Sequence, residues 1–391
     1  MKIKTACALI CAALLLTSCG NGAGVTTAAE SAQEDTETTA AVTEETTAAE
    51  TAEEVKELKR ITFEGKREIV IQSGTWAPRV CTYGEYLVAG YESPGGIMVC
   101  RSSNGGKSFS RPVQASFFPE LNCANVNFYK DGDTLYLAYR ATKNEGGLYT
   151  SLRVSVSDDG GESWRHHSTV CEYRDKNGRG GVWEPYILRL NGELTCVYAN
   201  DHPSRTDRQN IEYRVFRDGA WKKITIISNG KRHDSRDGMP VLCTYGENGY
   251  VCVIESTAER AGGHPFVLKL FYSKDGVKWS DPVTIYTPKT NGSKAAAPGI
   301  VLLPDGRFVI SFQTDEDATV KGDATSVMKF IVSDGSAPWE LDEDSFTEPE
   351  NIFGTPDGEG SVWTGIFYAD GLLYAAAGTR KGSSLKITEI G

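Results

Sequence analysis

One short turn recurs along this chain at a nearly constant interval. It is most complete at 157–164, where the residues are Ser-Asp-Asp-Gly-Gly-Glu-Ser-Trp. Related turns lie at 102–109 and 273–279, and two degenerate ones lie near Asp218 and Asp334. The five copies begin near residues 102, 157, 216, 273 and 333, so the intervals are 55 to 60 residues. A fixed period of this size is typical of a repeat architecture.

The residues of the repeated turn suit a tight connection between two strands. The Asp or Asn can accept hydrogen bonds from nearby backbone amides, and the glycine supplies a backbone conformation that other residues reach only with strain. The Trp or Phe begins the next strand, where its ring can be buried between sheets. The turn resembles the Asp-box, or BNR repeat, of sialidase-like β-propellers, and the copy at 157 matches Ser-x-Asp-x-Gly-x-x-Trp at every position. This resemblance implies an all-β fold and does not by itself imply a chemistry.

The length of chain after residue 58 fits six blades of about 55 residues. The expected innermost strands lie at 78–83, 123–129, 182–190, 238–245, 298–303 and 362–368. The last blade lacks a clear fourth strand, which the alternating stretch 60–72 could supply, closing the ring. The sequence therefore predicts a six-bladed β-propeller over residues 59–391, with the Asp-box turns on its bottom face.

The first 58 residues are predicted to be an export signal and a tether. Two lysines precede an apolar run at 6–16, which is too short to span a bilayer, and Leu-Thr-Ser-Cys follows at 16–19. This ending resembles a bacterial lipobox, which implies removal of residues 1–18 and lipidation of Cys19; an ordinary secretory peptide is the alternative. We expect an extracellular protein that contacts the cell membrane only through this lipid. Residues 19–58 hold ten acidic residues against one lysine and few large apolar ones, so we expect a disordered acidic tether rich in Thr, Ala and Glu.

The charge of the predicted propeller is nearly balanced, since residues 59–391 carry 38 Lys and Arg against 42 Asp and Glu. Nothing there indicates a basic surface for nucleic acid. Seven cysteines follow residue 58, an odd number with no Cys-x-x-Cys pair and no Cys/His cluster. We therefore predict neither a disulfide framework nor a metal site, and we expect a monomer without a cofactor.

Propeller topology places the start of each innermost strand and the end of each second strand on the top face. Polar and aromatic residues gather at these positions. The candidates for substrate binding are Arg79, Asn125, Arg140, Trp183, His202, Arg236, Asp237 and Trp363. Each class has a structural alternative: a tryptophan is usually in the core, an arginine can tie strand ends together, and a histidine can stabilise a loop. Together these residues predict a carbohydrate or anion site on the top face.

Two carboxylates on this face are the candidates for catalysis. Glu184 lies at the entrance of an innermost strand, and Glu255 ends the apolar run 251–254. A carboxyl group at such a strand end is desolvated on one side, which raises its pKa and suits acid/base chemistry. Glycoside cleavage needs two such groups flanking the scissile bond. The alternative for either residue alone is a surface carboxylate paired with an arginine.

Around these carboxylates the chain resembles the exo-arabinanases of glycoside hydrolase family 93, a branch of the sialidase-like propellers. The matching segments are Trp183-Glu184-Pro185, Arg236-Asp237-Gly238-Met239 and Ile254-Glu255-Ser256. Weaker agreement extends over most of 75–280, and the last two blades match poorly. The resemblance implies retaining hydrolysis of α-1,5-linked arabinan from one chain end, with Glu184 as nucleophile and Glu255 as acid/base; the two roles could be exchanged. For a tyrosine that the family places in a late blade, only Tyr368 and Tyr374 are candidates.

Two other functions are alternatives. A sialidase needs three arginines around a carboxylate, an Asp acid/base and a Tyr nucleophile. Arg79, Arg236 and Arg380 fall on three blades, but the first strand lacks the Arg-Ile-Pro order that sialidases favour. A non-catalytic carbohydrate-binding propeller is the second alternative, because Asp-boxes also occur in proteins without hydrolase activity. The presence of both Glu184 and Glu255 favours the hydrolase, with an oligo- or polysaccharide as its substrate.

Overall fold

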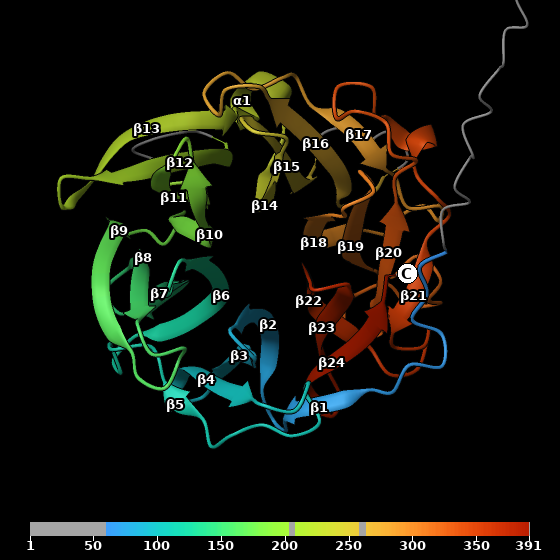
Figure 1. Ribbon diagram of the computed structural model, residues 1–391. Coiled ribbons are helices and arrows are strands. Elements are labelled where there is room, and N and C mark those ends of the chain that lie inside the picture. The colour runs from blue at the N-terminus through green and yellow to red at the C-terminus, as the bar shows by residue number, and fades with distance from the viewer. Residues whose placement is uncertain (1–59, 203–207, 258–262, 391) are drawn as a thin grey trace, which may run out of the picture. The chain divides into compact units, whose positions relative to one another are not determined.

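The computed structural model describes residues 60–202, 208–257 and 263–390; the predicted signal peptide, Cys19 and the whole of the predicted tether lie outside them. The described part is almost entirely β-structure. It forms six four-stranded antiparallel sheets arranged around a central axis (Figure 1). The predicted six-bladed β-propeller is therefore confirmed.

Each blade has an innermost strand, two middle strands and an outermost strand. The innermost strands of blades 1 to 6 are β2 (Trp76–Tyr83), β6 (Asn122–Asp131), β10 (Val182–Leu190), β14 (Asp237–Tyr245), β18 (Ala295–Leu302) and β22 (Ser361–Ala369). The second strands are β3 (Tyr86–Ser93), β7 (Thr134–Asn144), β11 (Glu193–Asn200), β15 (Gly249–Ser256), β19 (Phe308–Thr314) and β23 (Leu372–Thr379). The third strands are β4 (Gly96–Ser102), β8 (Leu148–Ser157), β12 (Asn210–Arg217), β16 (Val267–Ser273), β20 (Val327–Val332) and β24 (Gly382–Glu389). The outermost strands are β5 (Val113–Gln114), β9 (Arg165–Asp175), β13 (Ala220–Ser228), β17 (Val283–Tyr286), β21 (Glu350–Phe353) and β1 (Ile69–Gln72). Within the described ranges, three short helices lie in connections: α1 (Gly230–His233), η1 (Asp323–Thr325) and η2 (Glu343–Ser345).

The closure of the ring also follows the prediction. Strand β1, from the start of the propeller, pairs antiparallel with β24 and completes the sixth sheet, with Ile69 opposite Leu385. The six innermost strands overlap the six predicted segments. The two ends of the described chain are thereby held in one sheet, which joins the last repeat to the first.

The hydrophobic core is divided into six clusters, one between each pair of neighbouring blades. Strand β15 shows how one sheet serves two clusters. Its Val251 and Val253 face the cluster between blades 4 and 5, whereas Cys252 and Ile254 face the cluster between blades 3 and 4. This follows from the period of two residues in a strand, and it explains why a buried thiol serves here as a small apolar side chain.

The Asp-box turns connect third strands to outermost strands, at the end of each blade opposite the start of its innermost strand. In the copy at 157, Ser157 Oγ donates to Asp159 Oδ1 (2.7 Å) and accepts from Gly161 N (2.8 Å). Ser163 N donates to the same Asp159 oxygen at 2.9 Å. The copy at 102 repeats these bonds around an Asn. Trp164 then packs between blades 1 and 2, so the turns stabilise the bottom of the ring and leave the top face for function.

Candidate active site

All six innermost strands contain the same backbone irregularity close to their first residues. One residue in each strand has a positive φ of 49° to 57°, and pairing with the second strand shifts register at that point. These residues are Ala77, Asn125, Glu184, Met239, Ala297 and Trp363. A positive φ is unfavourable for residues other than glycine, so the surrounding contacts must hold it. The six bulges surround the top end of the central channel. We call this top end the funnel.

The predicted catalytic carboxylates are held by two of these bulges. Met239 N donates to Glu184 Oε2 at 3.0 Å, and Ala297 N donates to Glu255 Oε2 at 3.0 Å. In both cases the acceptor belongs to the preceding blade. Each carboxylate therefore spans a boundary between blades and has one oxygen fixed by a backbone amide.

A third carboxylate occupies an equivalent position, and sequence reasoning missed it. Asn125 N donates to Glu92 Oε1 at 2.7 Å, just as Trp363 N donates to Gln313 Oε1 at 2.7 Å in blades 5 and 6. Burial raises the pKa of Glu92, against the opposing charges of nearby arginines. A signal was present, because β3 ends in Glu-Ser at 92–93 in the same way that β15 ends in Glu-Ser at 255–256.

Glu184 and Glu255 approach a single peptide unit, the one between Gly238 and Met239. Glu184 accepts the hydrogen bond from Met239 N, and a Cβ placed on Gly238 would lie 3.0 Å from Glu255 Oε1. Because these contacts are made by adjacent backbone positions, the two carboxylates lie within about 10 Å of each other. Glycosidases place their two carboxyl groups at separations of this order across the scissile bond.

Burial raises the pKa of both carboxyl groups. Glu255 is only 6% exposed, and its pKa is raised to about 7, first by burial and second by the charge of Glu184. The pKa of Glu184 is raised as well, chiefly by burial, although Arg236 and Arg140 act against the shift. Compensation for Glu255 is weak, because Arg236 is 3.4 Å away (Nη1 to Oε1) and its side chain is 44% exposed. One member of the pair can therefore hold a proton near neutral pH while the other is ionised.

Trp183 and Arg140 form one unit next to Glu184. The indole Nε1 of Trp183 donates to Asp201 Oδ1 at 2.7 Å, and the same oxygen accepts from Gly181 N at 2.7 Å. The guanidinium of Arg140 lies over the Trp183 ring, with Cζ 5.3 Å from its centroid. Two residues predicted to bind substrate are thus brought together and oriented before any ligand arrives.

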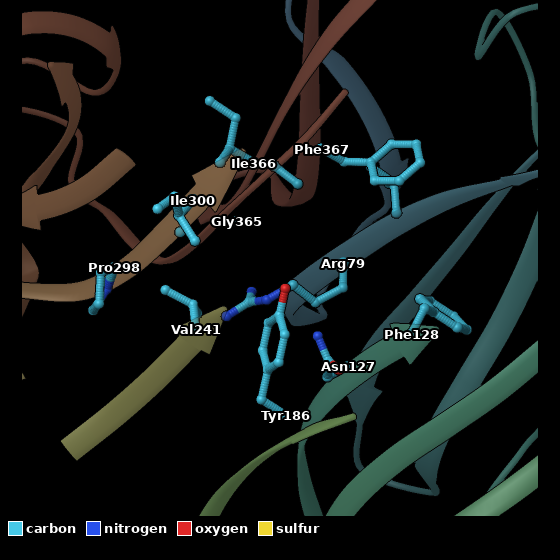
Figure 2. Close-up of a pocket in the computed structure, with 13 residues that line it drawn as sticks. Arg79, Asn127, Phe128, Tyr186, Val241, Pro298, Ile300, Gly365, Ile366 and Phe367 are labelled. Atoms are coloured by element: carbon cyan, nitrogen blue, oxygen red, sulfur yellow. The ribbon is translucent and has the colours of Figure 1, made fainter. Parts of the chain in front are cut away.

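Arg79 lies deeper, in the central channel. Figure 2 shows its side chain extending between Tyr186 and Val241, which belong to other innermost strands. Its Nη1 donates to the backbone oxygens of Pro78 (2.9 Å) and Trp363 (2.8 Å), and burial lowers its pKa to about 10. The cavity around it measures about 80 Å³, the space of a few water molecules. This position makes Arg79 part of the floor of the funnel.

Two other residues predicted to bind substrate are enclosed by their neighbours. Asp237 is 2% exposed and accepts hydrogen bonds from the hydroxyls of Ser228 and Ser256. His202 is buried against Tyr173, with ring centroids 4.7 Å apart. Both side chains occupy supporting positions at the top ends of strands.

Known structures share this architecture. Neither a protein-family model nor a curated protein sequence matches the chain. An α-L-arabinanase from Penicillium chrysogenum, solved with arabinobiose, is 17% identical, with a TM-score of 0.63 over 83% of this chain and 98% of its own. The family 93 α-L-arabinofuranosidase of Fusarium graminearum, also solved with arabinobiose, is 15% identical, with a TM-score of 0.62 over 82% and 96%. The K499G mutant of the NanB sialidase of Streptococcus pneumoniae is 12% identical, with a TM-score of 0.54 over 85% of this chain and 70% of its own. The fold is that of the sialidase-like propellers.

The resemblance to sialidase-like propellers drawn from the Asp-boxes is thereby confirmed, with family 93 arabinanases among its structural neighbours. At these identities the comparison establishes the fold. The choice of substrate has to rest on the residues of the site, because unrelated functions share one propeller architecture.

Both candidates for the late-blade tyrosine pack with hydrophobic clusters of this sialidase-like propeller, Tyr374 buried and Tyr368 partly buried. Tyr374 belongs to the cluster between blades 6 and 1, and Tyr368 packs against the cluster between blades 5 and 6. The tyrosine that shares a cavity with Glu184 is Tyr186, of β10. Burial raises its pKa, and its Oη donates to Leu242 O at 2.7 Å. Sequence reasoning overlooked it because it follows Glu184 in an ordinary apolar strand.

The structure also bears on the predictions about metal ions, membrane spans and cysteines. In residues 60–202, 208–257 and 263–390, no group of three or more His, Cys, Asp or Glu side chains is placed to hold a metal ion. The same part of the chain contains no helix with the length and apolarity needed to cross a membrane. Its seven cysteines are free thiols.

Proposed function

We propose that this protein is an extracellular glycoside hydrolase, an exo-acting arabinanase that cleaves α-1,5-linked arabinan with retention of configuration. The observation that supports it best is the convergence of Glu184 and Glu255, from neighbouring blades, on one peptide unit, together with the pKa of about 7 for Glu255. Two structural neighbours of the same fold were solved with arabinobiose, which supports arabinose as the sugar.

In the first step of this mechanism, protonated Glu255 donates its proton to the glycosidic oxygen of the leaving sugar. Glu184, as a carboxylate, attacks the anomeric carbon from the opposite side, and the bond to the leaving oxygen breaks. A covalent glycosyl-enzyme results. In the second step Glu255 accepts a proton from a water molecule, whose oxygen attacks the anomeric carbon and releases Glu184 as a carboxylate.

The electrostatics of the pair suit this exchange of roles. The charge of Glu184 is one cause of the raised pKa of Glu255. That charge disappears when Glu184 is esterified by the sugar, so Glu255 becomes a stronger acid at the stage at which it must act as a base. The raised pKa of Glu255 in the free enzyme suits its role as an acid in the first step. The lower pKa of Glu255 in the glycosyl-enzyme suits its role as a base in the second step.

Two polar atoms beside Glu184 are buried and retain unused hydrogen-bonding capacity. Within the described residues, Asn125 Oδ1 and Arg140 Nε have no hydrogen-bond partner. Buried polar groups are normally paired, so hydrogen bonding is incomplete at these two positions. Asn125 lines the same small cavity as Glu184, and Arg140 is stacked on Trp183. These contacts support a sugar-binding role for Asn125, Arg140 and Trp183.

The arginines considered for a sialidase have separate surroundings. Arg79 binds backbone carbonyls in the channel, Arg236 pairs with Glu255, and Arg380 lines a groove between blades 6 and 1. A triad for one carboxylate requires three convergent guanidinium groups. These contacts favour a neutral sugar over a sialoside.

Chemical rescue tests the two roles with an activated aryl α-L-arabinofuranoside as the substrate. With azide present, E184A should form a glycosyl azide of inverted configuration, because azide replaces the nucleophile. E255A should form one of retained configuration, because azide attacks the glycosyl-enzyme. Proton NMR of the anomeric hydrogen distinguishes the two products, and the reverse pattern would exchange the roles.

We also propose that the lipid on Cys19 anchors the enzyme to the outer face of a bacterial cell. Mass spectrometry of the N-terminal peptide should find the chain beginning at Cys19 with a lipid attached, and replacing Cys19 with Ser should abolish this attachment. A wild-type protein from the membrane fraction with an unmodified Cys19 would contradict this anchor.

A further inference from the structure

Two tryptophans remain exposed on the top face, across the ring from the paired carboxylates. Trp76 begins β2 and Trp363 lies at the bulge of β22, and they are 44% and 37% exposed. Large aromatic side chains are favoured at recognition surfaces, where one face of the ring can be covered by a partner. Trp183, in contrast, is partly buried and bonded to Asp201.

The two tryptophans line one groove of about 600 Å³. Its other walls are Asp323 in the loop after β19, the backbone at 358–360 before β22, and Arg380 in the turn between β23 and β24. All these segments lie at the top ends of strands, on the face that carries Glu184 and Glu255. A volume of this size falls within the range of ligand sites and is larger than one sugar unit requires.

The groove is held rigidly before any ligand binds. Trp363 N donates to Gln313 Oε1 at 2.7 Å, and its carbonyl oxygen accepts from Arg79 Nη1 at 2.8 Å. Thr75, which precedes Trp76, is buried, and its hydroxyl donates to Gln72 O at 2.9 Å and is hydrogen-bonded to the hydroxyl of Ser383 at 2.9 Å. Both indoles are therefore attached to a fixed backbone, which lowers the entropy lost on binding.

The groove is also connected to the catalytic pair. Thr364 Oγ1, next to Trp363, donates to Ala297 O at 2.8 Å. The amide of the same Ala297 donates to Glu255 Oε2 at 3.0 Å. One residue, Ala297, thus links the wall of the groove to the proposed acid/base.

The charges of the groove suit a neutral ligand. Asp323 and Glu359 line it together with Arg380, and Asp323 is paired with Lys294. The remaining carboxylate and guanidinium balance each other, so the groove offers no net attraction to an anionic polymer. Indole faces cover the apolar C–H faces of sugar rings, while the charged side chains can bond hydroxyl groups.

We propose that this groove is a distal subsite that binds the linear neutral glycan chain several sugar units from the scissile bond, through stacking on Trp76 and Trp363. The proposal rests on the hydrolase function proposed above and adds to it a preference for long chains. Loss of both stacking faces should weaken binding by about tenfold, which corresponds to about 1.4 kcal/mol.

The test compares kcat/KM of wild type and W76A/W363A over linear α-1,5-arabino-oligosaccharides of increasing length. In wild type this value should rise with length until the groove is filled. In the double variant the ratio between the longest and shortest substrates should fall about tenfold, through KM and not kcat. W339A is the matched control, because Trp339 is 48% exposed but packs on Tyr245 and Tyr272 beyond the groove. An unchanged ratio in a folded double variant, judged by its melting curve, would overturn the proposal.

Direct binding separates failure of the groove from failure of the proposed function. If wild type hydrolyses no oligosaccharide, calorimetric titration with the longest one still tests the groove. Binding by wild type and W339A that is weakened about tenfold in W76A/W363A would support the subsite alone. W76F/W363F should retain part of the affinity, because phenylalanine keeps a stacking face. No binding by wild type, or equal binding by all variants, would overturn it.

Discussion

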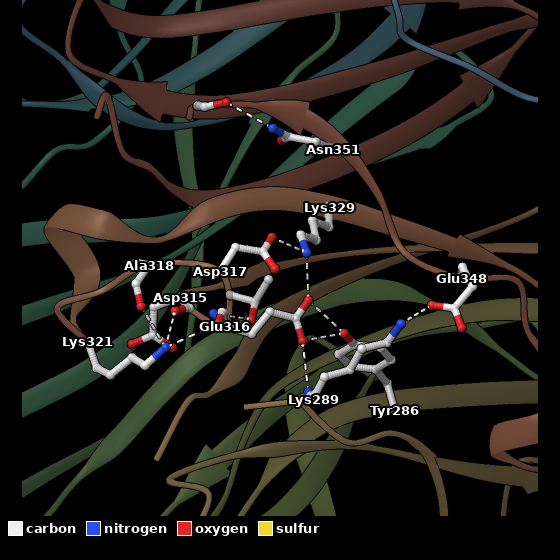
Figure 3. Close-up of polar contacts among 12 residues, drawn as sticks. Tyr286, Lys289, Asp315, Glu316, Asp317, Ala318, Lys321, Lys329, Glu348 and Asn351 are labelled. Atoms are coloured by element: carbon white, nitrogen blue, oxygen red, sulfur yellow. Dashed lines mark hydrogen bonds and ion pairs between the residues drawn. The ribbon is translucent and has the colours of Figure 1, made fainter. Parts of the chain in front are cut away.

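Two regions of the top face contain carboxylates that are buried to a similar extent but differ in the hydrogen-bond donors and cations around them. Glu316, in the loop after β19, is 4% exposed, and Glu255 is 6% exposed. Figure 3 shows Glu316 enclosed by donors: Tyr286 Oη bonds both of its oxygens (2.8 and 2.6 Å), Lys289 N bonds Oε2 at 3.0 Å, and Lys329 Nζ lies 2.7 Å from Oε1.

Glu255 has far less compensation than Glu316. It receives one backbone amide and a guanidinium at 3.4 Å, and it lies close to a second carboxylate, Glu184. Burying a charge is unfavourable unless a countercharge and hydrogen bonds replace the lost water. Burial alone therefore does not identify an active site. The catalytic candidates are the buried carboxylates whose compensation is incomplete, which leaves them able to change protonation state during a reaction.

The largest expected effect is a loss of activity when the carboxylates Glu184 and Glu255 are changed. E255Q removes the proton donor, so kcat/KM for arabinan should fall by about 10²–10⁴-fold, and E184Q should be at least as damaging because no nucleophile remains. Steady-state assays of purified variants measure this loss. An exposed control, E162Q, should keep the wild-type rate. Near-normal turnover by either active-site variant would place the chemistry elsewhere.

The second prediction concerns the region around Glu316, and the quantity measured is the free energy of unfolding. K329M leaves Glu316 buried without its ammonium partner, so the free energy of unfolding should drop by about 3–5 kcal/mol. The control K289M removes only an ammonium that pairs with exposed Glu348, and it should lose less than about 1 kcal/mol. Urea denaturation gives both values. If K329M melts like wild type, the Glu316 cluster is not the structural counterpart described here.

The third prediction uses the pH dependence of stability to test whether the charge of buried Glu255 is incompletely compensated. The folded-state pKa of Glu255 is raised from 4.5 to about 7, so its protonation stabilises the native state fully below pH 4.5. That contribution is lost as pH rises towards and through 7, and it amounts to about 3 kcal/mol at most. E255Q should therefore be more stable than wild type at pH 8, and the difference should disappear at pH 4. Thermal melts across this window would contradict the prediction if E255Q were less stable at pH 8.

The architecture could be predicted from sequence because it depends on a repeated local signal. The copies at 102, 157 and 273 indicated the spacing of the blades, and the alternating stretch before Trp76 indicated the strand that closes the ring. Glu184 and Glu255 were recognisable because each lies at a strand end beside apolar residues. These features follow from spacing and from the two-residue period of a strand.

The remaining parts of the site depend on contacts between blades, which one sequence does not display. The positive φ at Met239 and Ala297 turns their amides towards the carboxylates of the preceding blade, and no residue type marks these bulges. Asp237 was predicted to bind substrate beside Arg236, and its position between two serine hydroxyls emerged only from the fold. Glu92 was missed because its strand, β3, lies in a different blade from Glu184 and Glu255. Strand β3 nevertheless ends in Glu-Ser, as β15 does.

The most direct test of the central claim is product analysis of the protein incubated with linear α-1,5-arabinan, with a sialoside as the paired control. The account predicts that arabinobiose or arabinose accumulates from chain ends, with the α anomer released first, and that E184Q forms neither product. Release of sialic acid from the control would contradict the account and favour a sialidase. No product from either substrate would contradict the arabinanase and favour a propeller that binds carbohydrate without cleaving it.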